Sequence, residues 1–366
     1  MYVLKTLLSQ YLRTAITITG IALCVVLMLF LLSIYKGSAD GSVEYVRSSS
    51  ADIWVLQNNA TNILRNTSLL PATYGSTLQS IPGVKSVAPV LFLLASIKLP
   101  GHPASIYLTG YDLQAVNGGP PSIFKGKNVS RDEEIVLDRS FAAKYKIGVG
   151  DQVLIKNDTL IVCGLSNGTN MFVLQFAFIT MKKSRELIGF PGIVSVFQIN
   201  IDEGISCSEV IKRINSKIPN VAAFDKPTFL DNNQYESKAG ILPLLFVVIV
   251  IGAIILTAIL SLILTVNVLE QRKDYAIMKA LGSPVGFISG QVIRQAMVLA
   301  GTGMLLAIVL FFPLIRVIEK ISPEISAKSS WWQVIIVMVC LFVISLISSV
   351  IPNLRLRKIY PLEVFH

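Results

Sequence analysis

The longest apolar stretch of the chain is residues 241–269, ILPLLFVVIVIGAIILTAILSLILTVNVL, which contains no Asp, Glu, Lys or Arg. A helix needs about 20 apolar residues to cross the hydrocarbon core of a bilayer. Residues 15–35, 296–315 and 331–351 form three further stretches of this kind. Together they predict a membrane protein with four transmembrane α-helices, one before and three after a long polar segment at residues 36–240.

The overall composition agrees with a membrane protein. Of 366 residues, 53% are hydrophobic and only 15% are charged, whereas soluble domains carry about 25% charged residues. This excludes a disordered chain and a basic nucleic-acid-binding domain, so no nucleic-acid partner is expected. The absence of charged residues within the spans argues against an ion relay through the membrane.

The distribution of charge predicts the orientation. Residues 1–14, 270–295 and 352–366 together hold nine basic and three acidic residues, whereas residues 37–238 hold 19 and 17. By the positive-inside rule, both termini, the loop at 270–295 and the tail at 352–366 are cytoplasmic, and the large domain is outside. Residues 1–14 place Leu4, Leu7, Leu8, Tyr11 and Leu12 on one helical face, which predicts an amphipathic helix on the membrane surface. A simple extension of the first span is the alternative.

Residues 36–240 mix strand and helix patterns and predict an α+β domain. Strands are expected at 52–56, 105–108, 134–137, 152–155, 160–162 and 194–201, a turn at 157–158, and a helix at 206–218. The last strand, this helix and residues 221–224 form a strand–helix–strand unit. Residues 78–84, LQSIPGV, resemble residues 215–221, NSKIPNV, which suggests two related subunits.

The sequence offers little catalytic chemistry. Its two histidines, His102 and His366, build no metal cluster or catalytic triad, and no P-loop motif is present. A paired-carboxylate site at residues 132–134 and Asp138 is an alternative to a solvated start of a strand, and the second interpretation is favoured. No enzyme activity, cofactor or metal is therefore expected. Whether Cys163 and Cys207 form a disulfide stays open.

The segment after the second span is the most informative one. Residues 269–284, LEQRKDYAIMKALGSP, continue the span as a helix that Gly282 and Pro284 end. Tyr275, Met278 and Leu281 recur at i, i+3 and i+6 as an apolar ridge. Such a helix could transmit a push from a soluble partner, or it could lie on lipid headgroups.

This segment resembles the signature that follows the second span of MacB/FtsX-like ABC transporter permeases. The matching residues are Glu270, Arg272, Ala276, Ile277, Lys279, Ala280, Leu281, Gly282 and Ser283. Residues 12–22, 136–151 and 358–363 are also similar to family segments, so the resemblance covers nearly the whole chain.

The resemblance implies a permease subunit of a bacterial cell membrane that pairs with a second permease chain and with a separate ATPase. Because these 366 residues contain no P-loop motif, the ATPase is expected to be a separate chain. The implied ATPase-coupling residues are Glu270, Arg272, Lys273, Tyr275, Met278, Lys279, Leu281 and Gly282. ATP hydrolysis would move the external domain for export, efflux or envelope transport, a process called mechanotransmission. A periplasmic adaptor and an outer-membrane channel are candidate further partners.

Two other function classes stay open. The same movement could serve a transmembrane regulator that activates an external partner such as a cell-wall hydrolase. A membrane-anchored enzyme is disfavoured because the catalytic residues are missing. The substrate, and whether the dimer is homo- or heteromeric, do not follow from the sequence.

Overall fold

The computed structural model of the protein describes residues 11–63, 67–99, 103–171, 174–323 and 330–357. It divides into two compact units. The first, the helical unit, comprises Met1–Lys36, Leu242–Val317 and Ala327–His366. The second, the α+β domain, comprises Gly37–Ile241 and Ile318–Ser326.

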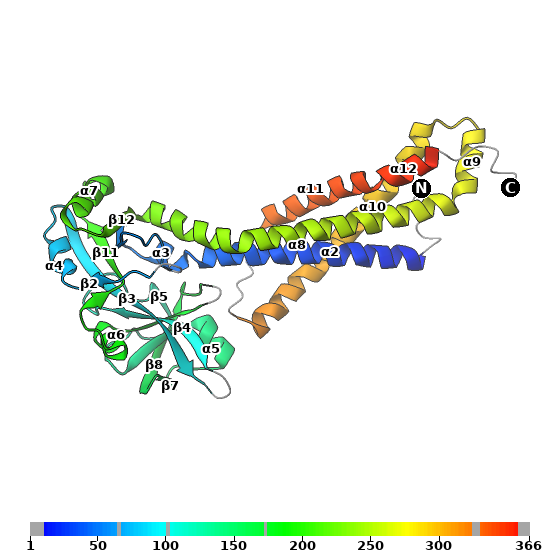
Figure 1. Ribbon diagram of the computed structural model, residues 1–366. Coiled ribbons are helices and arrows are strands. Elements are labelled where there is room, and N and C mark those ends of the chain that lie inside the picture. Colours follow the sequence, from blue (N-terminus) through cyan, green and yellow to red (C-terminus); the bar gives the residue numbers. More distant parts are fainter. Residues whose placement is uncertain (1–10, 64–66, 100–102, 172–173, 324–329, 358–366) are drawn as a thin grey trace. The chain divides into compact units, whose positions relative to one another are not determined.

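Long helices occupy the four predicted spans (Figure 1). They are α2 (Tyr11–Gly41), α8 (Lys226–Glu270), α10 (Val285–Ile321) and α11 (Trp331–Ser348), the last followed by α12 (Val350–Arg357). The short helix α9 (Arg272–Ala280) separates α8 from α10, so most of the loop predicted at 270–295 is helical. Of the amphipathic helix predicted at 1–14, residues 1–10 lie outside the described residues and the rest belongs to α2.

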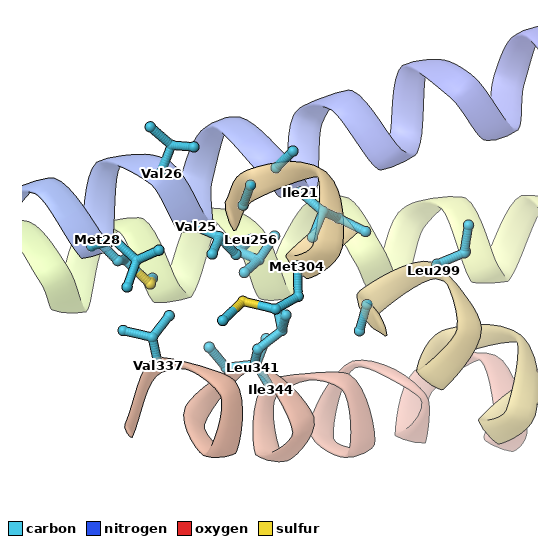
Figure 2. Close-up of a cluster of buried hydrophobic side chains, with 14 of the residues drawn as sticks. Ile21, Val25, Val26, Met28, Leu256, Leu299, Met304, Val337, Leu341 and Ile344 are labelled. Carbon is cyan, nitrogen blue, oxygen red and sulfur yellow. The ribbon is translucent and has the colours of Figure 1, made fainter. Parts of the chain in front are cut away.

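One apolar cluster lies between the four helices of the helical unit (Figure 2). It includes Ile21, Val25 and Met28 of α2, Leu256 of α8, Leu299 and Met304 of α10, and Val337, Leu341 and Ile344 of α11. Gly303 permits a close approach of α10 to α2, because a Cβ there would lie 2.5 Å from Ile21 Cγ2. The helices therefore pack through interdigitating aliphatic side chains and a small-residue contact.

The α+β domain contains twelve strands among its described residues. They are β1 (Ile53–Gln57), β2 (Leu70–Pro71), β3 (Val84–Lys98), β4 (Ala104–Tyr111), β5 (Ser122–Gly126), β6 (Glu134–Asp138), β7 (Gln152–Ile155), β8 (Asp158–Asn167), β9 (Phe176–Thr180), β10 (Ile193–Val194), β11 (Val196–Ile201) and β12 (Val221–Asp225). Its helices are α3 (Glu44–Ser48), α4 (Tyr74–Gln79), α5 (Arg139–Tyr145), α6 (Met181–Ile188) and α7 (Cys207–Lys217). The predicted α+β class is confirmed.

The fifteen-residue strand β3 joins two parts of one ten-stranded sheet. Its first half completes an antiparallel sheet in the order β12-β1-β11-β3. Its second half pairs with β4 and β7, and the pairings β4-β9-β6-β8-β7 return to it, so these six strands form a closed ring. Closure pairs the last residues of β3 with β7, which protects this end of the strand from pairing with other chains.

The four-stranded sheet is built from two strand–helix–strand units, β1-α4-β3 and β11-α7-β12, which is a split βαβ arrangement. The two similar heptapeptides occupy equivalent places, between α4 and β3 and between α7 and β12. Ile81 and Ile218 are buried in the same apolar cluster. Gly83 and Asn220 both have positive φ, 94° and 59°, as expected for the two residue types that tolerate this conformation best. The similarity therefore reflects one turn used twice.

The predicted strands overlap β1, β4, β6, β7, β8, β10, β11 and β12. The predicted turn at 157–158 is wrong by one residue: β8 begins at Asp158, and Lys156 has the positive φ of 55°. The cysteines are free; Cys163 is buried in one apolar cluster, whereas Cys207 packs against another.

The carboxylates at the two ends of β6, Glu134 and Asp138, accept hydrogen bonds from neighbouring residues of the domain. Burial would raise the pKa of Glu134, but hydrogen bonds from Lys127 and from the N–H and hydroxyl of Ser130 lower it to about 2. Asp138 accepts from the N–H groups of Ser140 and Phe141 and so caps α5, and its burial raises its pKa. These carboxylates have structural partners, which agrees with the interpretation as the start of a strand.

Candidate coupling site

The candidate site is the connection from α8 through α9 to α10, visible in Figure 1 at one end of the long helices. Helix α8 ends at Glu270, Gln271 follows, and α9 begins at Arg272. At the other end of α9, Ser283 N donates to Met278 O and Gly282 N to Lys279 O, both at 3.0 Å. Gly282 has φ +86°, and a Cβ at this position would meet no atom within 4 Å. Glycine is therefore favoured here by the backbone conformation that reverses the chain at the helix end, and not by crowding.

Tyr275 and Ala276 anchor α9 to the helical unit. Both are fully buried, and they pack in an apolar cluster with Val268 of α8, Ile288 and Val292 of α10, and Leu356 of α12. Met278 is partly buried against the same cluster. The cluster joins residues more than 80 positions apart, so the position of α9 depends on three other helices.

The ridge predicted at Tyr275, Met278 and Leu281 is therefore not one exposed stripe. Tyr275 points inward, Met278 lies at the boundary, and Leu281 is 82% exposed. Ile277, a residue of the family pattern that is not among the predicted coupling residues, is 44% exposed. Ile277 and Leu281 are four residues apart and share a helical face, so together they form an exposed apolar surface at the end of α9.

Polar contacts fix both ends of α9. The Nζ of Lys279 donates to the carbonyl oxygen of Leu356 at 3.0 Å, which satisfies a carbonyl near the end of α12. Arg13 of α2 forms an ion pair with Glu270 at 2.6 Å, which joins the start of α2 to the end of α8. Arg272, Lys273 and Asp274 are exposed, so the first turn of α9 presents charges of both signs.

Across the described residues, no group of three or more His, Cys, Asp or Glu side chains is placed to hold a metal ion. Ile277 and Leu281 are exposed apolar side chains beside charged ones, on a short helix whose other face is buried.

The sequence is similar to known permease families and to individual permeases. Residues 14–217 match the MacB-like periplasmic core domain, and residues 246–361 match the C-terminal domain of FtsX-like permeases. An uncharacterized ABC transporter permease of Mycobacterium tuberculosis is 24% identical over 360 residues, which cover 96% of this chain and 95% of the relative. One of Methanocaldococcus jannaschii is 24% identical over 229 residues, 60% of this chain and 57% of the relative.

Two solved structures are similar to parts of the chain. The periplasmic region of MacB from Actinobacillus actinomycetemcomitans matches with TM-score 0.40 and 13% identity, covering 52% of this chain and 96% of that one. The extracellular domain of the ABC-type transporter YknZ from Gram-positive bacteria matches with TM-score 0.38 and 11% identity, covering 48% and 100%. Since the core-domain match alone spans more than half of the residues, the chain belongs to the MacB/FtsX-like ABC transporter permeases and is a multi-pass membrane protein.

Proposed function

We propose that the chain couples ATP hydrolysis by a separate ATPase to movement of its α+β domain, for export or envelope transport. The observation that carries the proposal is helix α8, which runs as one element of 45 residues from Lys226 to Glu270. At about 1.5 Å per residue it is roughly 67 Å long. A continuous helix can transmit a displacement along its axis because its backbone hydrogen bonds resist stretching.

Both ends of α8 are held by side chains. At the first end, the ring of Phe229 stacks on Trp54 of β1 at 4.9 Å, and the Oδ1 of Asn233 accepts the N–H of Ile63 at 3.1 Å. At the second end, Glu270 is paired with Arg13 and the chain enters α9. A force on α9 would therefore reach the core of the α+β domain through one helix.

A second connection supports the same mechanism. Helix α2 is followed by α3, whose Tyr45 is buried and donates its hydroxyl to the carbonyl oxygen of Gly118 at 3.0 Å. Tyr45 also lies 4.6 Å from Phe176 of the ring of strands, centroid to centroid. In α8, Pro243 removes one backbone hydrogen bond near the boundary between the two units. We infer that α8 bends there when the α+β domain moves.

The coupling proposal predicts an ATPase partner. Purification of the tagged full chain from its own membranes, after mild crosslinking, should recover an ATPase with a P-loop motif, a second permease chain, and ATP hydrolysis by the complex. Recovery of the permease without such an ATPase would contradict the proposal. Capture of a cell-wall hydrolase at the α+β domain, with neither adaptor nor substrate, would favour the regulator instead.

The mechanism also requires α9 to face the cytoplasm, where ATP is available. We propose the orientation that the basic short segments favour, with α9 and both termini inside and the α+β domain outside. In a cysteine-free background, a membrane-impermeant maleimide applied to intact cells should label Glu203→Cys, an exposed position before α7. It should label Ala280→Cys only after the membrane is opened. The reverse pattern would contradict this topology.

A further inference from the structure

A second site candidate lies in the α+β domain, along the side of β3 that faces away from β4. On this side, the pairing of β3 with β11 stops at Val90, which lies opposite Val196. The pairing with β7 begins only at Ile97. Among the described residues, no strand pairs with this side of β3 between these two positions. Strand β3 therefore has an open edge in its middle, although it is paired on this side before and after the gap.

The backbone groups of β3 alternate in direction, as in any strand of an antiparallel sheet. Ser195 N donates to Val90 O at 2.8 Å, and Phe92 N donates to Ser195 Oγ at 3.0 Å. The even-numbered residues of this part of β3 therefore direct their N–H and carbonyl groups to the open side. Leu94 is the next of these residues.

The neighbour of Leu94 on β4 supports this direction. Tyr107 lies opposite Leu94 and donates its N–H to Gln175 O at 2.9 Å, on the β9 side of β4. Leu94 and Tyr107 thus form a non-hydrogen-bonded pair, in which the two backbones point away from each other. In the part of the chain that the structure describes, nothing pairs with the N–H and the carbonyl of Leu94 on the open side.

A cavity of about 470 Å³ lies along this open edge. Four consecutive residues of β3, from Leu91 to Leu94, line it. Because successive side chains of a strand point to opposite faces of the sheet, a cavity that all four line lies beside the strand and not over one face. Three lining side chains, Phe190, Leu94 and Leu69, are large, apolar and 65%, 60% and 50% exposed. None of the described lining residues is charged.

We propose that this edge binds an extended, apolar segment of another polypeptide as an added strand. The N–H and the carbonyl of Leu94 pair with the backbone of the segment, and the cavity takes its uncharged side chains. In strand addition, main-chain hydrogen bonds provide affinity and side-chain pockets provide specificity. A charged side chain is disfavoured because it would lose its hydration without finding a partner in this neutral wall. The proposal concerns the α+β domain alone and does not depend on the ATPase contact at α9.

The test uses the full chain in detergent micelles and a capped peptide, acetyl-Lys-Thr-Val-Leu-Val-Thr-Lys-amide, titrated by calorimetry. We expect saturable binding in the millimolar range or tighter. Three further peptides carry one N-methyl group each, at the first valine, the leucine or the second valine. They have the same composition, so they partition into detergent alike. Methylation should weaken binding about tenfold at alternate positions only, because every second N–H of an added strand faces β3.

Two pairs of variants test the site from the side of the chain. Leu94→Pro removes the N–H on the open side and no hydrogen bond to Tyr107, so it should weaken binding of the unmethylated peptide about tenfold. Leu94→Val keeps this N–H and should bind normally. Phe190→Asp places a charge in the cavity wall at an exposed position and should also weaken binding, whereas Phe190→Leu should not.

Thermal unfolding of each variant shows whether it is folded, and the Phe190 pair decides the result if Leu94→Pro is not. Absence of saturable binding by the unaltered chain would overturn the proposal. An equal effect of methylation at all three positions would also overturn it, because such binding would not be strand addition.

Discussion

Replacing Leu281 by glutamate is expected to weaken association with the ATPase by roughly 30-fold or more. Leu281 is 82% exposed, and fully burying a leucine side chain contributes about 1.5–3 kcal/mol. A carboxylate buried in the same place would have no partner. The measurement is co-purification of the ATPase with the variant, together with ATP hydrolysis by the complex.

Control substitutions distinguish a lost contact with the ATPase from a loss of the permease's own stability. Leu281→Met keeps an apolar side chain of similar volume and should retain the ATPase. Met278→Glu should also weaken association, but Met278 packs against the Tyr275 cluster, so its thermal stability should fall as well. Leu281→Glu should leave the melting temperature unchanged. Unchanged co-purification and unchanged ATP hydrolysis with Leu281→Glu would refute this role for α9.

Replacing Phe229 by alanine is expected to lower the stability of the α+β domain by about 3–5 kcal/mol, the usual cost of truncating a buried aromatic residue. Phe229 is fully buried and lies between Trp54, at 4.9 Å, and Phe224, at 6.1 Å. Because it belongs to α8, its loss should also loosen the helix from the domain. Thermal unfolding should show a fall of roughly 2–4 °C per kcal/mol.

A milder substitution provides the comparison. Phe229→Leu fills part of the same space and should cost less, while Tyr235→Ala on the same helix, at a 70% exposed position, should cost little. The ATP-dependent movement of the domain can be measured as a change in maleimide labelling of Glu203→Cys. If Phe229 anchors α8, this change should be smaller when Phe229→Ala is also present. An unaltered melting temperature would show that this ring does not anchor the helix.

Several elements followed directly from local patterns. The four spans could be recognised because a bilayer demands long uncharged helices, and α7 because Val210, Ile214 and Ile218 recur on one face before Pro219. Strand β3 was missed. It carries Pro89, which local rules place at edges or outside strands, but here Pro89 lies opposite Phe197 in the ladder with β11.

Local sequence patterns also did not determine which side chain of α9 is buried at the candidate site. Helix α9 has apolar side chains at Tyr275, Ala276, Ile277 and Met278, which surround more than one face of a short helix. The periodicity of apolar residues alone therefore does not predict which of these side chains is buried. The choice depends on Ile288, Val292 and Leu356, which reach α9 only once α10 and α12 are packed.

By itself, the sequence determined the four spans, the α+β class of the long segment, and the resemblance to MacB/FtsX-like permeases, since hydrophobic length, periodicity and motif order are local properties of the chain. Only the tertiary structure decided that β3 closes a ring of strands, and that Tyr275 faces inward while Ile277 and Leu281 remain exposed. These features depend on contacts between residues distant in the chain, and such contacts form only when whole elements pack together.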